Sequence, residues 1–265
     1  MRLLRRILIT VVVTLAVVFA GGYWIAPVAL SFYAARKALP VARIVPTELK
    51  DKSVSDAPGA KLSYFGYEFE IPWDDLDATQ TKLYPENKPE KIRVDLHFRS
   101  GLRLWVTALP AHEWINDPDG AIRGAVIAVA SAFGKEAVRS DYSFVKSVYE
   151  FTPEKMHYWA VSPGIHYSEQ GVLIIKSIMP LESADTGIFN LQTQSYQGFQ
   201  QGNPQVRQNR LAIHLYSDDG SVEMMFFQKD YKSSVGVSQP EINRIVQSLR
   251  KAPQNESTTP RIAQK

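Results

Sequence analysis

The residue spacings in this chain that could support catalysis are few. Ser143 and Lys146 form an S-x-x-K pair, in which a lysine one helical turn away would activate a serine hydroxyl for nucleophilic attack. The S-D-N and K-T-G motifs that accompany this pair in penicillin-binding enzymes are absent from the sequence. We therefore interpret Ser143 as an early residue of an amphipathic helix and Lys146 as an exposed lysine.

Histidine and carboxylate spacings give no better indication of a metal or acid–base site. His112 and Glu113 begin like a zinc-binding H-E-x-x-H motif, but Asn116 stands where the second histidine is needed. Two groups of aspartates flank turn residues instead: Asp74, Asp75 and Asp77, and Asp117 and Asp119. The chain has no cysteine, which excludes thiol catalysis and cysteine metal sites. We predict no catalytic residue, no metal and no cofactor.

The candidate binding residues lie in a stretch rich in glutamine. Amide side chains hydrogen bond directionally and aromatic rings stack, so glutamines beside aromatic residues suit sugars or extended peptides. The alternative is a solvated strand face that runs into a loop containing Gly202 and Pro204. The candidate binding surface consists of Tyr196, Gln197, Phe199, Gln200 and Gln201.

A long apolar run near the N-terminus predicts where the protein resides. Residues 7–30 carry no charge and would form a helix of roughly 36 Å, which is enough to cross a hydrocarbon core of about 30 Å. Tyr23 and Trp24 fall where an interfacial aromatic belt is expected. The alternatives are a signal peptide cleaved after Ala20 and a buried helix. We expect the lipid bilayer to contact residues 7–30.

The distribution of charge predicts on which side of the membrane the N-terminus lies and argues against nucleic acid as a partner. Arg2, Arg5 and Arg6 favour a cytoplasmic N-terminus, which places the remainder outside the inner membrane, in the periplasm. The first 43 residues hold six basic residues and no acid. Their net positive charge is larger than the +3 of the whole chain. The rest is therefore slightly acidic, and nucleic acid is not an expected partner.

The order of predicted elements indicates an α+β fold with an antiparallel sheet covered by helices. Period-two alternation predicts strands over 62–73, 92–98, 102–109, 172–179, 188–199, 210–216 and 222–228. Helical spacing predicts helices over 121–133, 141–151 and from Ser238 onward, and a further helix start at Thr152. The helix over 121–133 is apolar nearly all round, so we expect it to be buried between layers.

The element order and the closing Ile245-Val246-Gln247-Ser248-Leu249 resemble the PsbP-like α/β/α sandwich. The resemblance covers residues 62–249 in element order and matches residues only in that last stretch. It implies a scaffold used by small accessory and binding proteins, and it assigns no functional residue to this chain.

These observations together predict a membrane-anchored protein with one globular domain. The expected parts are a cytoplasmic segment 1–6, a transmembrane anchor 7–30, a juxtamembrane segment and linker 31–61, an extracytoplasmic domain 62–250 and a disordered tail 251–265. The leading hypothesis is a non-catalytic binding or accessory protein of the bacterial envelope, with an envelope protein or glycan as partner. The alternatives are an envelope hydrolase with a dispersed active site and a protein that binds lipid or another small ligand.

Overall fold

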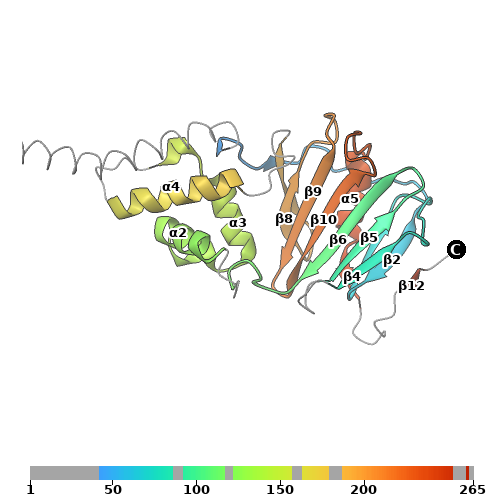
Figure 1. Cartoon of the computed structure of the whole chain (residues 1–265), viewed down its shortest axis with the longest axis horizontal. Helices are drawn as coiled ribbons and strands as arrows, with labels where there is room; N and C mark the ends of the chain where they lie inside the picture. The colour runs from blue at the N-terminus through green and yellow to red at the C-terminus, as the bar shows by residue number, and fades with distance from the viewer. Residues whose placement is uncertain are drawn as a thin grey trace, which may run out of the picture.

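The computed structural model describes residues 42–85, 92–116, 122–156, 163–178, 187–252 and 261–262. The predicted cytoplasmic segment 1–6, the predicted anchor 7–30 and most of the predicted tail 251–265 lie outside these residues. Within the described ranges, no helix is both long enough and apolar enough to cross a membrane. The described chain is α+β, with a mostly antiparallel sheet and helices that occupy separate regions (Figure 1).

The centre of the fold is an eight-stranded sheet with the order β1-β7-β8-β9-β10-β6-β5-β4. Its strands are β1 (Thr47–Glu48), β4 (Lys82–Pro85), β5 (Ile92–His97), β6 (Leu102–Leu109), β7 (Ile188–Gln192), β8 (Gln197–Gln201), β9 (Arg210–Ser217) and β10 (Gly220–Gln228). Among the strands that the structure describes, only β1 and β7 pair in parallel. The predicted hairpins β5–β6 and β9–β10 are confirmed, and β6 pairs with β10, so the two halves of the chain meet at this strand pair.

A smaller sheet has the order β11-β3-β2-β12, and it corrects one prediction. Its strands are β2 (Ala60–Tyr64), β3 (Tyr67–Ile71), β11 (Arg250–Lys251) and β12 (Arg261–Ile262). The single strand predicted over 62–73 is in fact the β2–β3 hairpin, which turns at Phe65 and Gly66. These residues have φ values of 56° and 78°, as a two-residue turn with two positive φ angles requires. Phenylalanine is uncommon in that conformation, so the sequence did not indicate the turn.

The main hydrophobic core lies between one face of the large sheet and α5 (Gln239–Ser248), with the β2–β3 hairpin beside them. The stripe predicted on this helix is confirmed, because Ile242, Ile245, Val246 and Leu249 are all buried. The helix begins with a capping box in which Ser238 and Glu241 bond reciprocally. Figure 1 shows α5 behind strands β6 and β10.

A second core is formed by helices at the β8 side of the sheet, opposite the end that carries β2 and β12 (Figure 1). The helices are α2 (Arg123–Phe133), α3 (Asp141–Glu150) and α4 (Pro163–Ile178), with short 3-10 turns η1 (Lys135–Val138) and η2 (Pro153–Lys155). The sequence predicted α2 and α3, whereas the helix expected from Thr152 is only the single turn η2. On the sheet, Phe199 and Tyr216 belong to this second core.

Helix α4 replaces the strand predicted over 172–179. Its buried residues Glu169, Val172, Leu173 and Lys176 recur at intervals of three and four, which is helical rather than strand spacing. Gly171 lets the helix approach α2 closely, since a Cβ there would lie 3.2 Å from the Cβ of Ala128. The β-branched run was misread because tertiary packing overrides strand propensity.

Helix α2 is present, but the prediction that it is buried between layers is wrong. Val129 is its only buried residue, whereas Ile127 is 57% exposed and Phe133 is 37% exposed. The helix packs against α4 through Ala128, and the ring of Phe133 meets that of Phe151 edge-on at 5.0 Å, whereas Ile127 is open to solvent. The helix is therefore apolar nearly all round although the protein covers it only in part.

Lys176 on α4 holds three segments of the helical region together. Its side chain is fully buried, and Nζ donates to the carbonyl oxygens of Ala42 (3.0 Å), Tyr149 (2.7 Å) and Phe151 (2.8 Å). Burial lowers the pKa of Lys176 to about 8, so the amine remains largely protonated at pH 7. In that form it has the three N–H donors that the three carbonyls need.

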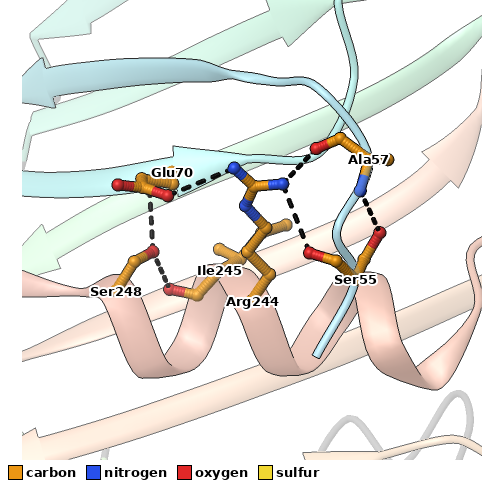
Figure 2. A network of polar contacts seen from close by, with 6 residues as sticks. All are labelled: Ser55, Ala57, Glu70, Arg244, Ile245 and Ser248. Carbon is orange, nitrogen blue, oxygen red and sulfur yellow. Dashed lines mark hydrogen bonds and ion pairs between the residues drawn. The ribbon is translucent and has the colours of Figure 1, made fainter. Parts of the chain in front are cut away.

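The part of the expected linker that follows Thr47 is attached to the domain. Arg244 on α5 donates through Nη1 to the carbonyl oxygens of Ser55 (3.3 Å) and Ala57, and through Nη2 to Glu70 on β3 (3.3 Å). Figure 2 shows the guanidinium between the 55–57 segment and the strand that carries Glu70. The folded domain therefore extends N-terminally beyond residue 62. We call residues 47–57 the stem.

Candidate functional site

The β7–β8 turn carries the most exposed part of the glutamine-rich stretch. Thr193 closes the turn, because its Oγ1 accepts from the amides of Ser195 (3.3 Å) and Tyr196 (3.0 Å). Its own amide donates to the carbonyl of Tyr196 at 2.9 Å. The side chains of Gln192, Gln194 and Gln197 are exposed around this closed turn. The turn thus presents three amide groups on a fixed backbone.

A cavity of about 270 Å³, which we call the polar groove, lies beside this turn. It is lined by His112, by residues 140–142 at the start of α3, by the turn 192–197, and by Tyr216, Ser217, Asp218, Gly220 and Ser221 of the β9–β10 hairpin. Its lining is polar and its volume suits a short polar segment better than a large apolar ligand.

A second cavity of about 360 Å³ adjoins the same turn. It shares Gln192, Thr193 and Gln197 with the polar groove and extends to the stem at Glu48 and to α5 at Asn243. The turn, which we call the ridge, therefore contributes lining residues to both cavities. A ligand lying across the ridge would meet the glutamine amides from both cavities.

Asp141 forms part of the floor of the polar groove. The residue is 4% exposed, and its Oδ1 accepts the backbone N–H groups of Trp114 and Ile115, both at 3.1 Å. Burial raises the pKa of Asp141, although the two backbone donors and nearby His112 act in the opposite direction. The carboxylate thus fixes the 114–115 turn onto the first residue of α3.

His112 and Ser221 supply groups in the groove that have no protein partner. Among the described residues, Nδ1 of His112 and Oγ of Ser221 are buried without a hydrogen-bond partner. Buried polar groups are usually paired, so such atoms deserve explanation. His112 also adopts a φ of 60°, which is uncommon for a non-glycine residue and is concentrated at functional sites. Both atoms are buried beside the groove, so a ligand in the groove would reach them only if neighbouring side chains moved.

The structure places the predicted candidate surface mostly inside the protein. Tyr196, Phe199, Gln200 and Gln201 are each at most 3% exposed, and only Gln197 is exposed. The predicted surface is corrected accordingly, because both faces of β8 are covered. Tyr196 and Gln197 still line the polar groove, whereas the other three residues do not.

Phe199 and Gln201 join β8 to the helical region. The ring of Phe199 stacks on Tyr142 at 5.4 Å and meets Tyr149 edge-on at 5.0 Å. Gln201 donates through Nε2 to the hydroxyl of Tyr149. These side chains face α3, so their role is packing between the sheet and the helices.

Gln200 points to the opposite face, where it begins a buried amide network. Gln200 and Gln239 on α5 exchange two hydrogen bonds of 2.8 and 2.9 Å. Gln239 also donates to Asn243 at 3.0 Å, and Asn243 donates to the stem carbonyls of Asp51 (2.9 Å) and Ser53 (2.7 Å). The network connects the sheet, α5 and the stem, so Gln200 has a structural role.

The S-x-x-K residues have structural contacts. Ser143 completes the capping box of α3: its amide donates to Oγ of Ser140 at 3.1 Å, and its own hydroxyl donates to the carbonyl of Ser140 at 2.9 Å. Lys146 is half exposed and lies 3.8 Å from Glu150. The interpretation of Ser143 as an early helical residue and Lys146 as an exposed lysine is confirmed.

Two described aspartates act in turns, as predicted. Asp77 accepts from the amide and hydroxyl of Thr79, and Asp75 accepts from the amide of Ser100. Asp117 and Asp119 lie outside the described residues. Within the part of the chain that the structure describes, no three histidine, aspartate or glutamate side chains are grouped to hold a metal ion.

Sequence reasoning missed the floor of the polar groove. His112, Asp141 and Ser221 come from three separate elements, and only the fold brings them to one cavity. The failed H-E-x-x-H match drew attention to His112 without indicating its partners.

Comparison with family models, with curated proteins and with solved structures finds no match for this chain, so the PsbP-like resemblance stays a prediction.

Proposed function

We propose that this chain is a single-pass protein of the bacterial inner membrane whose extracytoplasmic domain binds an extended polypeptide segment of another envelope protein, without catalysis. The proposed site is the polar groove and the ridge formed by the β7–β8 turn. The observation that carries the proposal is the set of exposed amides of Gln192, Gln194 and Gln197 beside the polar groove.

The edge of the large sheet supports a peptide as the ligand. Strand β7 pairs with β8 along one edge, and along its other edge β1 pairs only with Phe189 and Asn190. That second edge has no strand partner at Leu191 and Gln192 within the described chain. The cavity of about 360 Å³ is lined by these two residues. An extended peptide can add to such an edge through main-chain hydrogen bonds, while side-chain amides set its register.

A glycan is supported less well by the same residues. Stacking on sugar rings needs an accessible aromatic face, but Tyr196 and Tyr216 in the polar groove are 3% and 5% exposed. The accessible groups of the ridge are amides and hydroxyls, which match the donors and acceptors of a peptide backbone. The glycan is therefore an outcome to be tested rather than the proposed ligand.

Hydrolysis is the second candidate function, because His112, Asp141 and Ser221 line one cavity. Two observations disfavour it. Ser221 is 2% exposed, so a substrate carbonyl cannot reach its hydroxyl, and Asp141 already accepts two backbone N–H groups. A fluorophosphonate probe should leave the full-length protein unlabelled. Labelling that disappears in Ser221→Ala would instead establish a serine hydrolase.

The proposal is tested by site-specific photocrosslinking in cells. We would place p-benzoylphenylalanine at Gln194 on the ridge and, as a control, at exposed Lys232 far along the chain. We expect one dominant adduct from position 194 and none from position 232. The adduct should collapse on proteinase treatment and persist after muramidase treatment, as a peptide partner requires.

A triple variant tests whether the ridge itself binds the partner. Gln192→Ala, Gln194→Ala and Gln197→Ala combined should abolish partner recovery with little change in stability, because all three side chains are exposed. An adduct removed by muramidase would identify a glycan, and the absence of any adduct would refute the binding proposal.

Protease added to spheroplasts should degrade a C-terminal tag, and protection in spheroplasts would refute the proposed topology.

A further inference from the structure

The smaller sheet carries an excess of positive charge. Its strands contain two acids, Glu68 and Glu70, and four basic residues: Lys61, Arg250, Lys251 and Arg261. Glu70 pairs with Arg244 on α5, and Lys251 pairs with Asp219, so the two partners from outside the sheet cancel each other in charge. The chain after residue 43 is slightly acidic as a whole, so the charge of this sheet is opposite to that of its surroundings.

Two of these cations share one carboxylate oxygen. Oε2 of Glu68 lies 2.9 Å from Nζ of Lys61, 2.9 Å from Nη2 of Arg250 and 3.0 Å from Nε of Arg250. The side chain of Glu68 is 12% exposed, whereas those of Lys61 and Arg250 are 46% and 63% exposed. Hydrogen bonds from the two cations lower the pKa of Glu68, so it is a carboxylate at neutral pH.

The two cations have donors to spare. A lysine ammonium carries three N–H donors and an arginine guanidinium carries five. Within the described part of the chain, Glu68 is the only acid paired with either Lys61 or Arg250. A second carboxylate would therefore find both an uncompensated positive charge and N–H groups to bind.

A third cavity, of about 330 Å³, joins these cations to the ridge. Its lining includes Lys61, Arg250, residues 247–249 at the end of α5, and residues 193–195 of the ridge. Figure 2 shows one part of its wall, where the hydroxyl of Ser248 accepts from the backbone N–H of Glu70 at 2.8 Å. The ridge thus borders a cationic cavity in addition to the polar groove.

The other two cavities at the ridge have no cationic excess among their described lining residues. The polar groove holds Asp141 and Asp218 and neither lysine nor arginine. The cavity of about 360 Å³ balances two lysines against two glutamates: Lys52, Lys146, Glu48 and Glu150. A negatively charged group of a ligand on the ridge is therefore favoured in the third cavity.

We propose that Lys61 and Arg250 bind an acidic side chain of the peptide that lies across the ridge. This inference rests on the proposed peptide-binding function and adds the charge of the partner to it. The incoming carboxylate shares the two cations with Glu68 at the accessible side of the third cavity. Charged contacts at the rim of an interface mainly select the partner and speed its association.

The test measures the adduct formed in cells by the full-length protein with p-benzoylphenylalanine at Gln194. Lys61→Gln combined with Arg250→Gln removes both cations, and Lys82→Gln combined with Lys232→Gln removes the same charge at exposed lysines elsewhere. We expect the adduct yield to fall by about fivefold in the first double variant and to stay unchanged in the second, because exposed ion pairs contribute modestly. Unchanged yield in both would overturn this inference and leave the peptide-binding function intact.

Glu68→Gln distinguishes ligand binding from a structural role of the same residues. The change removes the internal carboxylate that competes for Lys61 and Arg250, so the adduct yield at position 194 should rise by about twofold. If the three side chains only stabilised the small sheet, losing Glu68 would lower the yield as losing the cations does. An unchanged or lower yield in Glu68→Gln would contradict the proposal.

Mass spectrometry of the adduct tests the chemistry of the partner directly. Gln247 is exposed and lines both the third cavity and the cavity of about 360 Å³, so p-benzoylphenylalanine there should also capture the peptide. The captured segment should hold an aspartate or glutamate within about three residues of the crosslink, since an extended residue spans about 3.5 Å. A segment without an acidic side chain would overturn this inference alone. No adduct from position 194 or 247 would refute the binding function and this inference together.

Discussion

The helices α5 and α2 are similar in length and opposite in how they use their apolar residues. Helix α5 is mostly polar, yet it buries Ile242, Ile245 and Val246 in the main core. Helix α2 is apolar nearly throughout and buries only Val129. The comparison teaches that the spacing of apolar residues, rather than their number, determines what the protein core encloses.

The regions around the two helices also differ in the contacts that hold them together. The α5 side is held by a continuous apolar core, to which the buried amide network of Gln200, Gln239 and Asn243 and the guanidinium of Arg244 attach the stem. The α2–α4 side depends more on buried polar contacts, in particular Lys176 with its three carbonyls and Asp141 with two backbone amides. The following predictions test this difference.

The largest expected effect compares two isoleucines. Ile245→Ala should lower the free energy of unfolding by about 2–5 kcal/mol, because it removes a fully buried side chain from the main core. Ile127→Ala should change it by no more than about 0.5 kcal/mol in detergent. Urea titration of the full-length protein, followed by tryptophan fluorescence, measures both. Equal losses would show that α2 is packed as tightly as α5.

Lys176→Met tests the polar support of the helical region. The variant keeps much of the side-chain volume but leaves the carbonyls of Ala42, Tyr149 and Phe151 without their donor. We expect a loss of about 2–4 kcal/mol, since each buried unpaired group costs roughly 1–3 kcal/mol. Lys146→Met, at a half-exposed lysine on α3, is the control and should be nearly neutral. A neutral Lys176→Met would mean that the region relaxes around the missing amine.

Asn243→Ala tests the buried amide network of the α5 side. The change removes two hydrogen bonds to the stem and should cost about 1–3 kcal/mol. It should also release the stem, so that trypsin cleaves faster at Lys50 and Lys52. Asn209→Ala, at an exposed asparagine, is the matched control. Cleavage that is unchanged in Asn243→Ala would show that Arg244 holds the stem alone.

Asp141→Asn gives the smallest expected effect, and its sign depends on pH. Burial raises the pKa of Asp141 above its ordinary value of 3.8, so the folded protein binds this proton more tightly than the unfolded chain. The stability contributed by the carboxyl is present below pH 3.8 and is lost as the pH rises through the folded pKa. Asparagine keeps the acceptor for Trp114 and Ile115 without the charge. The variant should therefore match the wild-type Tm at pH 3 and exceed it at pH 7. A lower Tm at pH 7 would show that the charge is needed.

The sequence predicted the elements whose local signals agree with their packing. Strand β5 alternates apolar and polar residues in sequence, β6 buries every second residue from Leu102 to Val106, and β9 and β10 are apolar runs joined by a short turn. Helix α5 combines the Ser238–Glu241 capping box with one apolar stripe. Helix α4 was missed because two of the buried positions that define its phase are charged residues, Glu169 and Lys176. A search for apolar periodicity assigns such residues to the surface.

The candidate site was predicted in location and only partly in composition. Tyr196 and Gln197 do line the polar groove, but the exposed amides that accompany them are Gln192 and Gln194 rather than Gln200 and Gln201. The sequence could not distinguish these pairs, because the turn that separates β7 from β8 is closed by Thr193 and carries no glycine or proline signal.

The way in which the stem is attached has a consequence for how this sequence can vary. Asn243 and Arg244 contact the stem at the carbonyl oxygens of Asp51, Ser53 and Ala57, which every amino acid possesses. These contacts with α5 therefore do not depend on the side chains of the stem. Divergence among natural variants should be high across residues 50–57 and low at the two α5 side chains that hold them.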